Sequence, residues 1–514
     1  MLAGLTGKHI ASAGRLGSGP ALGPHDSWVA GAAHGEWMTD TNVHAEIELK
    51  FLVPAATRVA LAAALAGRAP PRRVTLTASY FDTPDQRLAR AGLAWRMRRE
   101  GGRWVQALKA AGSGALERFE HEVVRPDASP DPDAHADTVP GRQLLALLHE
   151  ARQDGLDAGV RFETRVRRLA RRVRTRGAVV EIALDEGRLL AGDAVQRLCE
   201  VEFELVSGSP VAMLALAERW RQRFGLVYDP RNKAERGHRL AAGAPQMPLR
   251  KAARLRYDAD ASVQQAWVAV VDECLTQISR NAIGLADPAG GDPALRAEHV
   301  HQLRVGIRRL RSALRAFRGW VGEGEGSEPP AELVDGLRRL FAALGQLRER
   351  DVPEPAALIR ADETQRLLLA WITWRAGLEP PPEPLGSLKQ LARRRLRRWH
   401  RAIVRSCQAF DTLDPAALHD LRKQVKRQRY ALEFFAPLLP RKRAARHLQA
   451  LAAAQQCLGE INDLVVAREH YQALVSSEPA AWFAVGWLTA RLAEARVRAR
   501  GELDQLAGLA PLSG

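Results

Sequence analysis

The sequence predicts a multidomain α+β protein in which a closed antiparallel β tunnel precedes an all-helical half. Two observations support this prediction. In the first half of the 514-residue chain, short segments in which charged and apolar residues alternate occur repeatedly. Beyond a stretch rich in Gly, Ala and Pro at 241–248, nearly every segment has the spacing of an amphipathic helix, and this second half repeats itself.

The first strand is expected at 44–53, where the residues alternate with a period of two. On a strand, Glu46, Glu48 and Lys50 share one face, and the apolar residues between them share the other. A strand with one solvated face produces the same pattern, so the alternation is informative only because it recurs. Further candidate strands, most of them with charged residues at even spacing, are 75–81, 93–98, 104–109, 118–122, 162–173, 178–184 and 198–205.

Several charge-lined strands need a common wet interior, because a buried charge without a partner costs several kcal/mol. A closed antiparallel barrel provides one, with apolar residues outside and charged residues inside. The cations that could clamp phosphate oxygens are Arg96, Arg98, Lys109 and Arg118. The carboxylates that could hold a hard divalent cation such as Mg²⁺ or Mn²⁺ are Glu46, Glu48, Glu200 and Glu202. Such a site suits in-line attack of water on a phosphoryl group.

Composition narrows the class of partner. The formal net charge of +17 arises from 76 basic and 59 acidic residues, which indicates an anionic partner: nucleic acid, a membrane surface or a phosphate polymer. Aromatic residues make up only 6% of the chain and no nucleic-acid-binding motif is recognised, so a nucleic-acid role is disfavoured. The cysteines form no CxxC pair, so neither a zinc site nor a disulfide framework is predicted.

Targeting signals are not evident either. No run of about 18 apolar residues could span a bilayer, and the N-terminus lacks the apolar core of a secretory signal. We therefore expect a cytoplasmic protein without a membrane span. Residues 1–42 show no periodicity, so we expect them to be disordered, and Met38 is a candidate for the true translation start.

In the helical half, a basic motif occurs twice, and its second copy begins at His419, 118 residues after His301. The first copy consists of His301, Arg304, Arg308 and Arg311. The second copy consists of His419, Arg422, Lys426 and Arg429. Each set shares one helical face, where like charges repel by a few tenths of a kcal/mol per pair. The duplication predicts two similar bundles related by a pseudo-twofold, with an anionic ligand on these faces rather than water alone. The expected helices are 262–278, 297–317, 332–347, 364–376, 388–407, 415–435, 441–469 and 482–506.

The first half of the chain resembles the CYTH superfamily of triphosphate tunnel metalloenzymes over about residues 43–240. The motifs that carry the resemblance are Glu46-x-Glu48-x-Lys50, Tyr80-Phe81-Asp82-Thr83, Arg96-x-Arg98, Glu120-x-Glu122 and Glu200-x-Glu202-x-Glu204. The resemblance implies an eight-stranded tunnel that cleaves a linear triphosphate with Mg²⁺ or Mn²⁺.

The resemblance also implies roles for individual residues. The residues assigned to catalysis are Glu46, Glu48, Lys50, Glu120 and Glu122. The implied metal ligands are Glu46, Glu48, Asp185, Glu200 and Glu202. The implied substrate contacts are Lys50, Arg96, Arg98, Lys109, Arg118, Lys233 and an arginine at Arg165 or Arg168. Those last two alternatives fall on opposite faces of a strand, and the sequence leaves both open. His121 and Asp82 are expected to be structural.

The second half, from about Tyr257 onward, resembles the CHAD domain, a helical domain with conserved histidines. What this resemblance implies is binding of inorganic polyphosphate along a basic groove between the bundles, without catalysis. The implied contacts are His301, Arg304, Arg308, Arg311, His419, Arg422, Lys423, Lys426 and Arg429. One departure is Glu349 in the first repeat, where the family commonly has Asp.

The sequence thus predicts a disordered extension at 1–42, a tunnel domain at 43–241, a linker at 242–256 and a helical domain at 257–514. The expected function is metal-dependent hydrolysis of inorganic triphosphate, with polyphosphate binding by the helical domain and association with polyphosphate granules. The alternatives are a non-catalytic polyphosphate-binding or granule-associated protein, a thiamine or nucleoside triphosphatase, and an adenylate cyclase, because one fold hosts all of these activities.

Overall fold

The computed structural model describes residues 43–67, 70–112, 116–287, 292–321, 328–346, 355–378 and 386–510. The expectations for residues 1–42, for a start at Met38 and for Glu349 fall outside these ranges.

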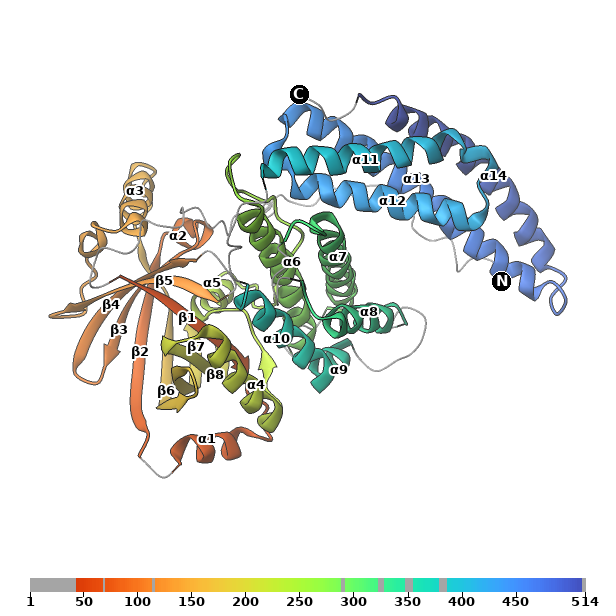
Figure 1. Ribbon diagram of the computed structural model, residues 1–514. Helices are drawn as coiled ribbons and strands as arrows, with labels where there is room; N and C mark the ends of the chain where they lie inside the picture. Colours follow the sequence, from red (N-terminus) through yellow and green to blue (C-terminus); the bar gives the residue numbers. More distant parts are fainter. Residues whose placement is uncertain are drawn as a thin grey trace.

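Eight strands close into an antiparallel barrel, which confirms the predicted tunnel (Figure 1). Their order is β5-β4-β3-β2-β6-β7-β8-β1, and β1 pairs with β5 to complete the ring. The short strand β9 (Val227–Tyr228) adds to the other part of β1. The barrel strands are β1 (Val43–Leu52), β2 (Arg72–Asp82), β3 (Leu93–Glu100), β4 (Arg103–Ala111), β5 (Glu117–Arg125), β6 (Gly159–Thr175), β7 (Ala178–Ala191) and β8 (Ala194–Gly208).

The outer face of the barrel is apolar where helices cover it. Phe51 and Phe203 lie on neighbouring strands and pack with Met213 of α4 (Pro210–Phe224), and all three side chains are fully buried. The helix α1 (Arg58–Ala66) adds Leu61 to the same cluster. The opposite side of the barrel is covered by α2 (Arg87–Arg90), the turn η1 (Pro132–His135) and α3 (Val139–Gln153). Residues that alternate with these apolar side chains therefore point into the barrel.

Asp82 has the structural role that was expected for it. Its carboxylate is fully buried and accepts hydrogen bonds from the backbone N–H groups of Thr83, Leu88 and Ala89, at 2.7 to 2.9 Å. These bonds satisfy donors at the start of α2, which the helix itself cannot satisfy.

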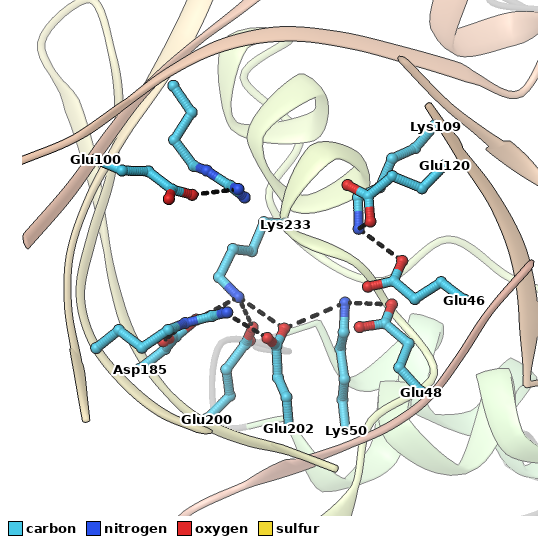
Figure 2. Close-up of polar contacts among 12 residues, drawn as sticks. Glu46, Glu48, Lys50, Glu100, Lys109, Glu120, Asp185, Glu200, Glu202 and Lys233 are labelled. Atoms are coloured by element: carbon cyan, nitrogen blue, oxygen red, sulfur yellow. Dashed lines mark hydrogen bonds and ion pairs between the residues drawn. The ribbon is translucent and has the colours of Figure 1, made fainter. Parts of the chain in front are cut away.

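One short helix, α5 (Lys233–Ala241), packs against side chains that face the barrel interior. Its first turn is fixed by Asn232, whose side chain accepts a hydrogen bond from the N–H of Glu235 at 2.7 Å. At Gly237 the helix approaches the ring of Phe162 so closely that an added Cβ would lie 2.0 Å from it. The helix thus closes part of one end of the barrel and aims Lys233 into the tunnel (Figure 2).

The helical half forms two groups of helices, and the first lies against the barrel (Figure 1). The first group contains α6 (Val263–Ala286), α7 (Pro293–Phe317), α8 (Ala331–Gln346), α9 (Pro355–Arg360) and α10 (Asp362–Ala376). The second contains α11 (Leu388–Gln408), η2 (Phe410–Thr412), α12 (Pro415–Phe434), η3 (Ala436–Leu438), α13 (Arg441–Leu474) and α14 (Ala481–Ala507). All eight expected helices are present, and α9 is an addition.

The two copies of the basic motif lie on α7 and α12, and these helices contact each other. The guanidinium of Arg309 bonds the carboxylate of Glu433, and the rings of Phe317 and Phe435 lie 5.2 Å apart. One continuous hydrophobic core joins both helix groups. None of the helices in the described ranges combines the length and the apolar character that a membrane span requires.

The barrel and the helical half share buried contacts. Leu369 and Ile372 of α10 belong to the hydrophobic cluster beneath α4. The backbone N–H of Tyr228 donates to the side-chain oxygen of Gln365 at 2.8 Å, and Arg221 bonds Asp362 across the same boundary. The helices therefore complete part of the apolar cover of the barrel.

Candidate active site

A cavity of about 2200 Å³ passes through the barrel. Figure 2 shows acidic and basic side chains from many strands that point toward this common space. Most of them lie at the inward positions of strands, and Lys233 comes from α5. Neighbouring strands bring the strand residues together in register. For example, Asp185 lies opposite Arg168 on one side and Glu200 on the other.

The carboxylates of Asp185, Glu200 and Glu202 form a buried acidic cluster, with one oxygen of each within 4.8 Å of the others. The ammonium of Lys233 lies among them, at 2.7, 2.6 and 2.8 Å respectively. Two guanidinium groups complete the neutralisation. Arg168 bonds both oxygens of Asp185 at 2.7 Å, and Arg236 bonds Glu200 at 3.0 Å.

Charge interactions keep Asp185 and Glu202 ionised. Burial favours the neutral acids, but Lys233 and Arg168 outweigh it and lower the pKa of Asp185. The pKa of Glu202 is also held well below its usual range, against burial, by Lys233, Lys50 and Arg168. Burial alone would lower the pKa of Lys233, and the three carboxylates instead raise it well above its usual range.

A second group of charges adjoins the first and is centred on Glu46 and Glu48. Lys50 links the two groups, because its ammonium lies 2.9 Å from Glu48 and 3.3 Å from Glu202. Arg118 bonds Glu48 at 2.7 Å and Lys109 bonds Glu46 at 2.6 Å. Although burial opposes ionisation, Lys50 and Arg118 hold the pKa of Glu48 at about 2. The pKa of Glu46 is raised by burial, and the carboxylates of Glu48 and Glu120 add to that effect.

The arginine pair on β3 forms the third group. Arg96 bonds Glu120 at 3.2 Å and the hydroxyl of Tyr80 at 3.4 Å, and Arg98 bonds Glu122 at 3.0 Å. Burial raises the pKa of the Tyr80 phenol, but Arg96, Lys233 and Lys109 together outweigh burial and lower it. Glu120 and Glu122 therefore fix the two guanidinium groups toward the cavity.

Arg165 does not belong to the site, and its assignment as a substrate contact was wrong. Its side chain is 62% exposed on the outer face of β6 and bonds Glu163. Arg168, three residues further along, lines the cavity. The reason is the two-residue period of the strand, which puts these two positions on opposite faces.

Several residues at the site were assigned no role from the sequence, although Tyr80 and Glu204 belong to the motifs named above. Tyr80, Glu100, Glu181 and Glu204 line the cavity, and Arg236 bonds Glu200 behind it. Strand alternation contained the signal for Glu100, Glu181 and Glu204, since each lies an even number of positions from an assigned residue on its own strand. Burial and the nearby Glu46 raise the pKa of Glu204 to about 7. No comparable signal marks Arg236, because the segment around it has no strand pattern.

The basic residues of the helical half gather along α7 and α12. Arg304 and Arg308 lie over the ring of Phe341 in α8, at 4.7 and 5.8 Å from its centre. Burial, together with the charges of Arg422 and Arg308, lowers the pKa of Lys426 to about 8, so the two repeats bring their cations near each other.

The remaining motif residues differ in their surroundings. Arg429 bonds Glu433 at 3.2 Å and Gln455 at 3.3 Å, whereas burial and neighbouring arginines lower the pKa of Arg311. His301, His419 and Lys423 are exposed.

The acidic cluster fits a hard divalent cation. Its donors are three carboxylates, the oxygen ligands that Mg²⁺ and Mn²⁺ prefer, and they converge on a point that already attracts a cationic group. Glu46 and Glu48 lie beside this cluster and engage Lys109, Lys50 and Arg118.

The chain matches two families of domains. The family model of the CYTH domain matches residues 44–238, and that of the CHAD domain matches residues 269–354 and 325–472. An inorganic triphosphatase of Haemophilus influenzae is 27% identical over 167 residues, which are 32% of this chain and 45% of that protein. This chain therefore spans less than half the length of that relative.

Solved structures match each half. The crystal structure of the CHAD domain from the plant Ricinus communis is 30% identical with a TM-score of 0.42, covering 52% of this chain and 99% of that one. A Hippeastrum protein described as having a dominant triphosphatase activity is 19% identical with a TM-score of 0.29, covering 38% of this chain and 96% of that one.

Proposed function

Because this chain joins a CYTH domain to a CHAD domain, we propose that it is a metal-dependent hydrolase that splits inorganic triphosphate into pyrophosphate and phosphate. The tunnel domain, residues 43–241, carries the activity, and the CHAD region, residues 257–514, binds polyphosphate and associates the enzyme with polyphosphate granules. The observation that carries this proposal is the convergence of buried carboxylates and buried cations on one cavity. These charges neutralise each other in the protein alone. A divalent cation can pair with the carboxylates while a polyanion pairs with the protein cations, so no charge is left unpaired.

The cations of the tunnel bind the phosphate chain. Guanidinium groups contact phosphate oxygens in a bidentate manner, and ammonium groups add point charges. The residues in this role are Lys50, Arg96, Arg98, Lys109, Arg118, Arg168 and Lys233. Glu120 and Glu122 hold Arg96 and Arg98 in place before the phosphate chain binds. Binding therefore costs little free energy for rearranging these donors.

Asp185, Glu200 and Glu202 would hold Mg²⁺ or Mn²⁺, with Glu46 and Glu48 beside them. A cation bound there would polarise a phosphoryl oxygen and neutralise negative charge on it. Lys233, which now bonds all three acids, then bonds phosphate oxygens, and Glu46 and Glu48 orient the attacking water. The raised pKa of Glu46 makes its carboxylate the better proton acceptor of the pair.

Hydrolysis of a substrate panel tests the tunnel activity. The full chain is incubated with tripolyphosphate, ATP, thiamine triphosphate or long-chain polyphosphate, each with Mg²⁺, with Mn²⁺ or with a chelator. We expect release of phosphate and pyrophosphate from tripolyphosphate with a metal only. Binding without turnover would instead identify a non-catalytic polyphosphate-binding protein, and preference for a nucleotide or thiamine substrate would reassign the substrate.

Calorimetric titration with long-chain polyphosphate tests the helical half. Changing Arg308 and Lys426 to Gln should weaken binding by about tenfold, since each phosphate contact contributes up to about 1 kcal/mol. The matched control changes Arg366 and Arg152 to Gln, which are exposed and belong to neither motif copy. Equal affinity in both double variants would contradict the proposed groove.

A further inference from the structure

The segment that connects the barrel to the helices is fixed to the wall of the cavity rather than free. Asn281 of α6 bonds the backbone of Arg250 twice, donating to its carbonyl at 2.8 Å and accepting from its N–H at 3.3 Å. The carboxylate of Glu273 accepts hydrogen bonds from the Arg250 guanidinium and from the N–H of Ala253. Leu255 is buried in the helical core. The backbone of this strip, residues 248–256, is therefore anchored along its length.

The cavity continues beyond the barrel along this strip. Its lining includes residues of the strip, one face of α6 and the start of α13. The continuation lies at the end of the barrel that α5 partly closes, because Arg280 of α6 bonds Glu235 of α5, and Arg239 of α5 bonds the carbonyl of Gln246 at 2.7 Å. At the opposite end, Arg72 and Arg172 line the mouth.

Exposed cations of the strip face this outer part of the cavity. Lys251, Arg254 and Arg256 are exposed and line it, and Arg441 at the start of α13 lines it as well. Within the described part of the chain, none of the four has an ion-pair partner. The tunnel cations differ in this respect. Lys50, Lys109, Arg118, Arg168 and Lys233 each contact a carboxylate.

This contrast points to a ligand that carries its own negative charge. Inside the tunnel, the protein supplies both signs, as a site for a metal and an anion requires. Along the strip, Glu273 is already bonded to Arg250, and Asp258 and Asp260 also line the cavity, but the four cations named above have no carboxylate partner among the described residues. Three of them lie on an anchored backbone in a cavity continuous with the tunnel. A linear phosphate chain has about one negative charge per unit. Units that extend beyond the tunnel would therefore meet the positive side chains of the strip, which neutralise their charge.

We propose that Lys251, Arg254, Arg256 and Arg441 form a second anion site that receives the part of a polyphosphate chain extending beyond the units held in the tunnel. This inference rests on the proposed function, since it takes the tunnel to bind one end of a phosphate chain. It makes the connecting strip a determinant of chain-length preference.

Competition against tripolyphosphate hydrolysis tests this site. The test variant changes Lys251, Arg254 and Arg256 to Gln in the full chain. The control variant changes Arg142, Arg152 and Arg167 to Gln, three exposed residues that do not line the cavity. Each variant lowers the net charge equally, and melting temperatures show whether both are folded. The inhibitor is linear polyphosphate well beyond three units in length, and its inhibition constant reports only binding that excludes tripolyphosphate from the tunnel.

The strip variant should hydrolyse tripolyphosphate with kcat/KM within about twofold of the unmodified chain, because exposed charges outside the tunnel are largely screened. Its inhibition constant for the longer chain should rise by about tenfold, as expected for three weak ionic contacts. The control variant should retain the original inhibition constant. Equal inhibition constants in the two variants would overturn the inference, as would an RNA of matched charge that inhibits as strongly and loses as much in the strip variant.

Failure of the proposed function gives a different result. If the unmodified chain does not hydrolyse tripolyphosphate, direct binding of long-chain polyphosphate is measured instead in a background with Arg308→Gln and Lys426→Gln. A further loss of about tenfold on adding the strip changes supports the second anion site. No further loss overturns it.

Discussion

Asp185 and Glu186 are neighbours on β7 whose carboxylates lie on opposite faces of the barrel wall. Asp185 is fully buried among Arg168, Lys233 and the other acids, whereas Glu186 pairs with Arg58 of α1 on the outside. Asp185→Asn should lower metal-dependent hydrolysis by about 10- to 100-fold or more. Changing a residue that merely supports a metal ligand already reduces metal affinity or activity to that extent. Glu186→Gln is the matched control and should retain activity.

Asp185→Asn also removes a partner from two buried cations, which costs on the order of 3–5 kcal/mol of stability. Circular dichroism melts therefore accompany the assays, carried out at a temperature where both variants are folded. Equal activity of the two folded variants would exclude Asp185 from the site.

Lys426 predicts a pH dependence of polyphosphate binding. Burial and the adjacent Arg422 and Arg308 lower its pKa to about 8, so the ammonium loses its proton as the pH rises from 7 to 9. Affinity should fall over that interval, and Lys426→Arg should remove the fall because arginine stays charged. Titration calorimetry at both pH values measures this, and an unchanged affinity in the unmodified protein would contradict it.

The effect of Lys426 on stability has the opposite direction. Between about pH 8 and pH 10.5, the unfolded chain binds more protons at this residue than the folded chain does. The contribution of Lys426 to folding stability therefore rises with pH across this window.

At the scale of the element, α5 determines where Lys233 lies. Gly237→Ala would push a methyl group into the ring of Phe162, and overpacking of this kind costs about 1–3 kcal/mol. The variant should melt at a lower temperature and hydrolyse less, since Lys233 moves with the helix. Gly501→Ala in α14 is the control. An added Cβ meets nothing within 4 Å there, and alanine favours a helix over glycine by up to about 1 kcal/mol, so its melting temperature should be unchanged or higher. A higher melting temperature for Gly237→Ala would contradict the packing of α5.

Strand alternation was sufficient to predict most of the tunnel. Glu46, Glu48 and Lys50 follow it, and all three lie in the cavity as expected. The pattern could not choose between Arg165 and Arg168, because an error of one position reverses the face and nothing local fixes the register. It also gave no indication of α5, whose charged residues suggest a surface segment. Only the closed barrel, which brings Phe162 against Gly237, makes this helix part of the interior.

At the scale of the whole molecule, α10 is part of the barrel's apolar cover. Leu369→Ala should cost about 2–5 kcal/mol, because its fully buried side chain packs with the cluster beneath α4. Hydrogen exchange measured by mass spectrometry should become faster in β7 and β8. Leu503→Ala in α14 removes an equally buried leucine from the other core and should leave exchange in these strands unchanged. Identical exchange in β7 and β8 for both variants would contradict the shared packing.

This contact could not be predicted from the sequence. The amphipathic spacing of 362–376 shows that α10 has an apolar face, but not which partner covers it. The stretch at 241–248 likewise suggested a simple linker, because its composition does not show what it contacts. The residues that anchor the strip after it, Asn281 and Glu273, lie in the next helix.

The ammonium of Lys233 among three carboxylates has a practical consequence for handling the protein. Some domains depend on a bound metal to neutralise the charge of its ligands, and they unfold when a chelator removes the metal. Here the chain carries its own counter-ion for the acidic cluster, so dialysis against EDTA should leave the melting temperature unchanged while abolishing turnover, and added Mg²⁺ or Mn²⁺ should restore it. On the proposed function, such a protein can be synthesised, folded and stored without metal, and it becomes active when metal and substrate arrive together.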